Sequence, residues 1–233
     1  MQLQNLVRRL GGMRVVIAGG HGKIALILER LLADRGDTTV GMIRNPDHAA
    51  DLQAAGAQPV VVDLEKTTAA DIAKHVQGAD AVVFAAGAGP GSGAARKQTV
   101  DCDAAILLAD AAETAGVRRY VMVSAIGADV EAPDDIGDPV FVAYLRAKGH
   151  ADDVIRARAA LDVTVVRPGH LTDDPGTGRV ELSDQTGRGD IPREDVAAVL
   201  VAVLDTSATA GRTFEVISGD TPIREAVSKL STS

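Results

Sequence analysis

The stretch that decides the fold is MRVVIAGGHGKIA, residues 13–25. Its first half is a short, almost wholly apolar β-branched run, typical of a strand that is covered on both faces of a parallel sheet. Its second half begins a helix, and Gly19, Gly20 and Gly22 join the two halves. Because glycine tolerates backbone conformations closed to other residues, this junction predicts a tight turn where a phosphate can approach bare N–H groups.

Beyond this turn, short apolar runs alternate with longer amphipathic ones, which is the pattern of βαβ units. After the first strand at 13–18, we expect strands at 38–44, 59–63, 81–85, 119–124, 163–167 and 213–217. We expect helices at 23–34, 46–55, 69–76, 94–115, 140–159 and 193–204, and a short final helix. Gly116 stands where a glycine C-cap is typical. The predicted fold class is α/β, a Rossmann-type doubly wound parallel sheet in a single domain with a small C-terminal cap region.

The bulk composition excludes several classes of partner. A formal charge of −8, a pI near 5.1, two Tyr, three Phe and no Trp argue against nucleic acid. No apolar run is long enough to span a membrane, and the first ten residues lack the apolar centre of a signal peptide. Cys102 is the one cysteine, which we expect to be a small buried hydrophobe; no disulfide framework or metal site is predicted. A cytoplasmic monomer or homodimer with a small-molecule substrate is expected.

The residue at the end of the second predicted strand indicates whether the cofactor is NAD or NADP. In Rossmann folds an acid there accepts from the 2′-hydroxyl of NAD, whereas an arginine accommodates the 2′-phosphate of NADP. Here the strand ends at Ile43-Arg44-Asn45, and the guanidinium fork of Arg44 suits a phosphate. We therefore expect NADP rather than NAD; the alternative is that Arg44 is a solvated strand-end residue. Asp63 at the end of the third strand is either a partner of the adenine amino group or a surface turn acid.

A series of short motifs follows the glycine loop in a fixed order: Gly19-x-x-Gly22-x-x-Ala25, Ile43-Arg44-Asn45-Pro46, Asp63-Leu64, Ala85-Ala86-Gly87, Val166-Arg167-Pro168-Gly169 and Ile191-x-Arg193-x-Asp195-Val196-Ala197. With these motifs the chain resembles the atypical short-chain dehydrogenase/reductase superfamily, in its NAD(P)H-binding branch of NAD-dependent epimerase/dehydratase type. The resemblance covers essentially the whole chain from Met13. It implies the fold and the cofactor, but it is weak for the substrate, because a fold does not fix a function.

The resemblance also implies a division of the chain and a set of cofactor-binding residues. Residues 1–12 are interpreted as an N-terminal extension and residues 13–233 as one NAD(P)-binding domain, with substrate or cap elements at 129–139, 170–190 and 205–233. The stretch Gly169 to Asp190 is expected to be a moving flap. The implied cofactor-binding residues are Gly19, Gly22, Lys23 and Ile24 at the pyrophosphate, Arg44 at the 2′-phosphate, Asp63 and Leu64 at the adenine, Ala85, Ala86, Gly87 and Lys148 near the nicotinamide ribose, and Pro168, Gly169, His170 and Leu171 at the nicotinamide ring.

Catalytic members of the superfamily use a Ser, a Tyr and a Lys, with the last two four residues apart. Tyr144 and Lys148 have this spacing on one predicted helix face, and Ser124 ends the fifth strand. A Lys148 ammonium near Tyr144 would lower the pKa of the phenol, which would then exchange a proton with a carbonyl or alcohol while Ser124 orients the substrate. The alternative is a packed Tyr and a snorkelling Lys. Asp101 stands where many catalytic members carry Asn.

Three functions follow from these residues. The leading hypothesis is an NADP-dependent oxidoreductase acting on a small carbonyl or alcohol, or an epimerase/dehydratase-like enzyme. The first alternative is a non-catalytic NADP-binding redox sensor or scaffold. The second is a flavin- or quinone-type reductase, in which hydride passes from NADPH to a planar acceptor without a Tyr acid.

Overall fold

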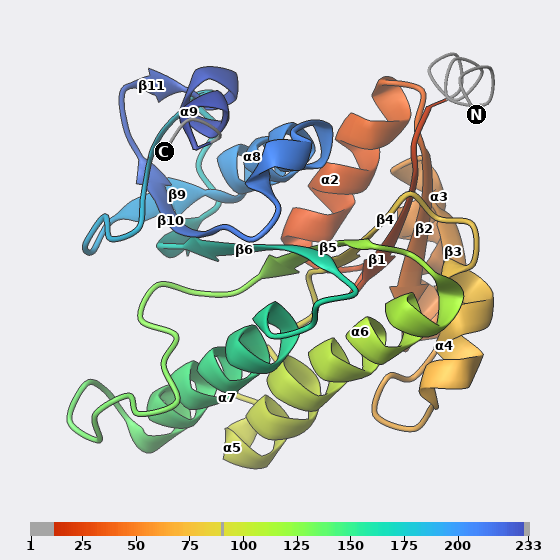
Figure 1. The fold of residues 1–233 in the computed structure, drawn as a ribbon, viewed down its shortest axis with the longest axis horizontal. Helices are drawn as coiled ribbons and strands as arrows, with labels where there is room; N and C mark the ends of the chain where they lie inside the picture. Colours follow the sequence, from red (N-terminus) through yellow and green to blue (C-terminus); the bar gives the residue numbers. More distant parts are fainter. Residues whose placement is uncertain (1–11, 90, 231–233) are drawn as a thin grey trace.

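The computed structural model describes residues 12–89 and 91–230, so the predicted extension at 1–12 lies outside the described residues except for Gly12. A central sheet with helices on both faces forms the molecule (Figure 1). Within the described part of the chain the sheet has nine strands in the order β11-β8-β10-β6-β5-β4-β1-β2-β3. This arrangement confirms the predicted doubly wound α/β class.

Seven of these strands run parallel: β1 (Arg14–Ala18), β2 (Thr38–Ile43), β3 (Gln58–Val61), β4 (Ala81–Phe84), β5 (Arg119–Val123), β6 (Asp162–Pro168) and β10 (Thr213–Ser218). The chain goes from β1 through β2 to β3 on one side, and then returns to place β4, β5 and β6 on the other side of β1. Because the strand order reverses between β1 and β4, a crevice opens at the carboxyl ends of these two strands.

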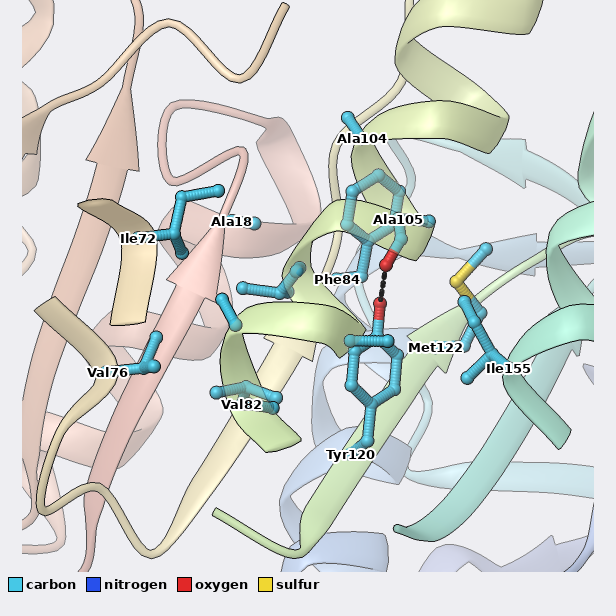
Figure 2. Packing of buried hydrophobic residues seen from close by; sticks show 14 of the residues in the cluster. Ala18, Ile72, Val76, Val82, Phe84, Ala104, Ala105, Tyr120, Met122 and Ile155 are labelled. Carbon is cyan, nitrogen blue, oxygen red and sulfur yellow. Dashed lines mark hydrogen bonds between the residues drawn. The ribbon is translucent and has the colours of Figure 1, made fainter. Parts of the chain in front are cut away.

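The helices divide between the two faces of the sheet. One face carries α4 (Ala69–Val76), α6 (Ala104–Ala115) and α7 (Pro139–Arg156); the other carries α2 (Lys23–Asp34), α8 (Arg193–Asp205) and α9 (Ile223–Lys229). Each face has its own buried apolar cluster. Figure 2 shows the first cluster, where the buried Tyr120 hydroxyl donates a 2.9 Å hydrogen bond to the Ala105 carbonyl. A third, small cluster packs α3 (Ala49–Ala54), which follows the 3-10 turn η1 (Pro46–His48), against the end of β2.

Several predicted boundaries are confirmed. Helix α2 has the predicted ends, and α4 does as well. Gly116 ends α6 with a φ of 72°, the left-handed conformation expected of a C-cap glycine. Cys102 is fully buried, as expected.

The predicted helix over 94–115 is wrong in one respect, because it is not one regular helix. It consists of α5 (Gly93–Arg96), a π-helical segment η2 (Lys97–Asp103) and α6. The wide π turns bury Val100, Asp101 and Cys102 together. Such turns occur most often at functional sites, and this one brings Asp101 to the end of β4.

The region after β6 also differs from the prediction of a loop. It contains β7 (His170–Thr172), β8 (Arg179–Ser183) and β9 (Asp190–Pro192). Strand β8 pairs antiparallel with β10 and with β11 (Thr221–Pro222), so much of the expected cap region extends the main sheet instead. β7 and β9 form a separate parallel pair. Short strands bounded by Gly and Asp give little local signal, because their partners lie far along the chain.

Candidate functional site

The glycine loop between β1 and α2 is folded tightly against the neighbouring strands. The Gly22 amide donates to the Gly19 carbonyl at 2.9 Å, and the Gly20 amide donates to the Met42 carbonyl of β2 at 2.9 Å. Gly19 has a φ of +84°, and a Cβ there would stand 2.5 Å from the Ala86 Cα. A side chain at this position would therefore separate the loop from the end of β4.

The loop forms one wall of a pocket of about 300 Å³ at the carboxyl ends of β1, β2, β3 and β4. Eight of the predicted cofactor-binding residues lie together in its lining: Gly19, Gly22, Arg44, Asp63, Leu64, Ala85, Ala86 and Gly87. Met42, Ile43 and Val62 add apolar surface beside them. The bare glycine backbone, the start of α2 and this apolar floor fit the adenosine and phosphate groups of a dinucleotide.

The other predicted cofactor-binding residues lie outside this lining: Lys23, Ile24, Lys148, Pro168, Gly169, His170 and Leu171. Lys23 forms an ion pair with Asp173, which also pairs with Arg193 at 2.7 Å. Asp173 thus ties the start of α2 to the segment after β7. The His170 ring is exposed at the start of β7, and its Nδ1 lies 3.0 Å from Asp190 Oδ1.

A charged cluster lines the pocket at the ends of β2 and β3. Arg44 Nη1 and Arg96 Nη2 both donate to Glu65 Oε2, at 3.2 and 2.8 Å, and Thr99 Oγ1 donates to Glu65 Oε1 at 2.7 Å. The Thr99 and Arg96 hydrogen bonds lower the pKa of Glu65, so this carboxylate is ionised at neutral pH. Arg44, Glu65 and Arg96 all line the pocket.

The predicted catalytic lysine is buried beside an acid. Lys148 Nζ donates to the Val123 carbonyl at 3.0 Å and lies 3.5 Å from Asp101 Oδ1. Asp101 Oδ2 accepts from the Ala88 amide at 3.2 Å, and Ala88 lines the nucleotide pocket. The Lys148–Asp101 pair is therefore attached to the pocket wall through one backbone hydrogen bond.

Tyr144 lies on the same face of α7, one turn before Lys148. Its phenol oxygen has no hydrogen-bond partner among the described residues, and Lys97 Nζ lies 5.3 Å from the ring centroid. The pKa of Tyr144 is raised, first by burial and then by the carboxylates of Asp101 and Asp152. The pKa of Tyr144 is therefore shifted opposite to the expected lowering, because burial and two nearby acids all disfavour the charged phenolate.

Ser124 is placed differently from the expectation that it faces a substrate. Its side chain is buried, and Oγ donates to Asp152 Oδ2 at 2.8 Å. The same Asp152 oxygen accepts from Arg167 Nε at 3.0 Å and lies 2.9 Å from Arg167 Nη2. Ser124, Asp152 and Arg167 therefore form a largely buried network that joins the end of β5 to α7 and β6.

The described residues contain neither a membrane-spanning helix nor a metal-binding cluster. None of the described helices has the length and apolar character needed to cross a membrane. No cluster of three or more His, Cys, Asp or Glu side chains capable of holding a metal occurs in residues 12–89 and 91–230.

The pocket geometry agrees with comparisons to known proteins. The model of the NAD(P)H-binding family matches residues 19–207. The uncharacterized sugar epimerase YhfK of Bacillus subtilis is 39% identical over 220 residues, which are 94% of this chain and 100% of that protein. The chain belongs to the NAD(P)H-binding family. It is an NAD(P)H-binding protein of the oxidoreductase and epimerase type, which confirms the predicted nicotinamide cofactor.

Solved structures of related proteins support the family fold. A Bacillus halodurans structure named for the NAD-dependent epimerases/dehydratases is 39% identical, with a TM-score of 0.85 over 94% of this chain and 100% of that one. The oxidoreductase ylbE of Lactococcus lactis is 27% identical, with a TM-score of 0.82 over 95% and 98% of the two chains.

Several residues of the Arg44–Glu65 cluster and of the Ser124–Asp152 network were not predicted from the sequence. Glu65, Arg96 and Thr99 come from two segments that meet only in the folded chain, so no local pattern indicated their contact. Asp152 was available to the sequence argument, because it extends the spacing of Tyr144 and Lys148 by one further helical turn.

Proposed function

We propose that this member of the NAD(P)H-binding family is an NADP-dependent oxidoreductase that reduces a small carbonyl substrate, with Tyr144 as the proton donor. One observation carries the proposal. The phenol of Tyr144, which has no hydrogen-bond partner in the described part of the chain, lies one helical turn from Lys148, and Lys148 is joined through Asp101 to the Ala88 amide of the pocket. When bound, the cofactor supplies the hydride, and the protein supplies position and the proton.

The state of Tyr144 favours reduction over oxidation. Burial and the carboxylates of Asp101 and Asp152 raise the pKa of Tyr144, so its phenol stays protonated through neutral pH. A protonated phenol can donate a hydrogen bond, and then a proton, to a carbonyl oxygen that gains negative charge during reduction. It is a poor base for removing a proton from an alcohol.

The preference for NADP rests on Arg44, which lines the pocket at the end of β2. Thermal unfolding with NADP⁺ and, separately, with NAD⁺ tests it, read by calorimetry or a dye because the chain has no Trp. A ligand at about 100 times its Kd stabilises the folded state by about 2.7 kcal/mol, which gives a clear shift. A larger shift with NADP⁺ that Arg44→Gln removes supports the proposal. Equal shifts with the two cofactors contradict the preference.

Turnover tests the reaction. We expect the protein to oxidise NADPH with members of a panel of small aldehydes, ketones and keto sugars. Sugars belong in the panel because the Bacillus subtilis relative is named a sugar epimerase. NADP⁺ binding without turnover on any member would instead support the redox-sensor alternative.

A second candidate function has its own support. The Ser124 hydroxyl donates to the buried Asp152 and is therefore committed away from a substrate carbonyl. This observation favours direct hydride transfer to a flavin- or quinone-like acceptor, which needs neither the hydroxyl nor the phenol. Reduction of free flavin or a quinone that survives Tyr144→Phe would support this function over carbonyl reduction.

A further inference from the structure

The charged cluster in the pocket contains a second guanidinium, that of Arg96, besides that of Arg44. Two guanidinium groups that line the pocket converge on one oxygen, Glu65 Oε2. Arg44 comes from the end of β2, and Arg96 comes from the last residue of α5. Cations held this close repel each other unless an anion lies between them.

Glu65 holds the two arginines in place and also shields them. It is anchored by Thr99 Oγ1 at 2.7 Å on its other oxygen. Its side chain is 22% exposed, compared with 57% for Arg44 and 36% for Arg96. The arginines therefore present accessible N–H groups toward solvent and the pocket, while the carboxylate is the less accessible partner.

The formal charges of the three side chains sum to +1, which leaves a site that is still attractive to an anion. A phosphate monoester carries more than one negative charge at neutral pH, and arginine forks bind it through paired N–H···O bonds. A phosphate bound between the arginines would compete with the Glu65 carboxylate for the same donors. Glu65 would then lower the affinity for the phosphate by like-charge repulsion while it keeps the donors in position.

We propose that Arg96 is the second guanidinium of the adenosine 2′-phosphate site and that Glu65 is the competing carboxylate that sets the ratio of NADP to NAD affinity. This inference rests on the proposed NADP-dependent function and adds the two residues that determine its specificity. It predicts that Arg96 and Glu65 act in opposite directions on ligands with a 2′-phosphate and have little effect on ligands without one.

The experiment uses two probes that differ by one phosphate, adenosine 2′,5′-bisphosphate and 5′-AMP, together with NADP⁺ and NAD⁺. Isothermal titration calorimetry on the full chain gives the Kd of each. Arg96→Gln should weaken the bisphosphate and NADP⁺ about tenfold and change 5′-AMP and NAD⁺ less than about twofold. Glu65→Gln should tighten the first pair several-fold and leave the second unchanged. Both effects should shrink as salt is raised, because the cluster is solvent-accessible.

The matched control is Arg156→Gln, which removes an exposed arginine of α7 that pairs with Asp153 on its own helix. It should alter no Kd. Thermal unfolding of each variant without ligand shows that it folds. A Glu65→Gln variant that binds the bisphosphate more weakly overturns the competing role of Glu65.

The failure of this inference can be separated from that of the proposed function. If the wild-type protein prefers NADP⁺ and the Arg96→Gln variant keeps this preference, the role of Arg96 is overturned. The assignment of NADP as the cofactor then still stands. Wild-type protein that binds NAD⁺ as tightly as NADP⁺ overturns both.

Discussion

Tyr144 is the residue on which the proposed reaction depends, and the chain supplies its own control. We expect Tyr144→Phe to lower the turnover of carbonyl substrates by about 100-fold or more, because a positioned acid contributes about that much. Binding of NADP⁺ should be unchanged. The measurement is the steady-state rate of NADPH oxidation, followed by the absorbance of the reduced nicotinamide.

The control is Tyr120→Phe, the other tyrosine of the chain. Its hydroxyl donates to the Ala105 carbonyl in the core (Figure 2), so its loss should cost about 1 kcal/mol of stability. Turnover of this variant should match that of the wild type. Equal losses of turnover in the two variants would show that Tyr144 acts through packing.

The buried Glu29 should make the free energy of unfolding depend on pH. Its side chain is fully buried on α2, both oxygens lack a partner among the described residues, and burial raises its pKa from 4.5 to about 8. The folded protein thus binds a proton that the unfolded chain releases above pH 4.5. Stability should therefore fall as the pH rises from 4.5 to 8, by up to about 1.4 kcal/mol per pH unit from this group, and then level off.

Chemical denaturation at a series of pH values measures this slope. Glu29→Gln should flatten it, because the amide does not titrate. Glu225→Gln, on the exposed face of α9, should keep it. A slope unchanged by Glu29→Gln would mean that another group binds the proton.

At the scale of elements, the glycine loop lets β1, the turn and α2 pack closely against the end of β4, because no side chain at Gly19 separates them. Gly19→Ala should abolish the stabilisation by NADP⁺, because its Cβ would stand 2.5 Å from the Ala86 Cα and displace the loop. The loss of fold stability from the left-handed backbone alone is about 1–2 kcal/mol. Thermal unfolding with and without NADP⁺ measures both effects.

Gly36 provides the comparison for this variant. Its φ is +90°, close to that of Gly19, but a Cβ there would meet nothing within 4 Å. Gly36→Ala should carry the same backbone cost and keep the full shift with NADP⁺. If the two alanine variants respond equally to NADP⁺, the close approach of the loop to β4 is not required for binding.

At the scale of the whole molecule, Arg119 joins elements that are distant in the sequence. From β5 its two Nη atoms donate to the Asp162 carbonyl and Thr164 Oγ1 of β6, and to the Val203 carbonyl of α8 and Thr209 Oγ1. Burial lowers the pKa of this guanidinium to about 10. Arg119→Met should destabilise the fold by about 3 kcal/mol, because four acceptors lose a donor in a partly buried site.

The neighbouring Arg118 gives the matched control. It makes an exposed pair with Asp162, with Nη2 2.9 Å from Oδ1, so Arg118→Met should cost less than about 1 kcal/mol. Urea denaturation compares the two variants. Equal losses of unfolding free energy in the two variants would mean that the arginine charge stabilises the fold, and not the buried hydrogen bonds of Arg119.

Much of the fold could be predicted from the sequence because its causes are local. The apolar run of β1, the glycines that follow it and the amphipathic pattern of α2 are contiguous in the chain, and α2 has the predicted ends. Eight residues of the pocket lining could be predicted because each follows the end of a parallel strand by a few positions, and parallel strands bring their carboxyl ends to one edge.

The tertiary structure alone decided the chemistry of the site. Arg96 bonds Glu65 across 31 positions and Ser124 bonds Asp152 across 28, and β8 pairs with β10 although β9 and α8 lie between them in the chain. The raised pKa values of Tyr144 and Glu29 also belong to the folded state. Contact between distant segments, and the removal of water from a charged group, depend on the packing of the whole chain, which no local pattern encodes.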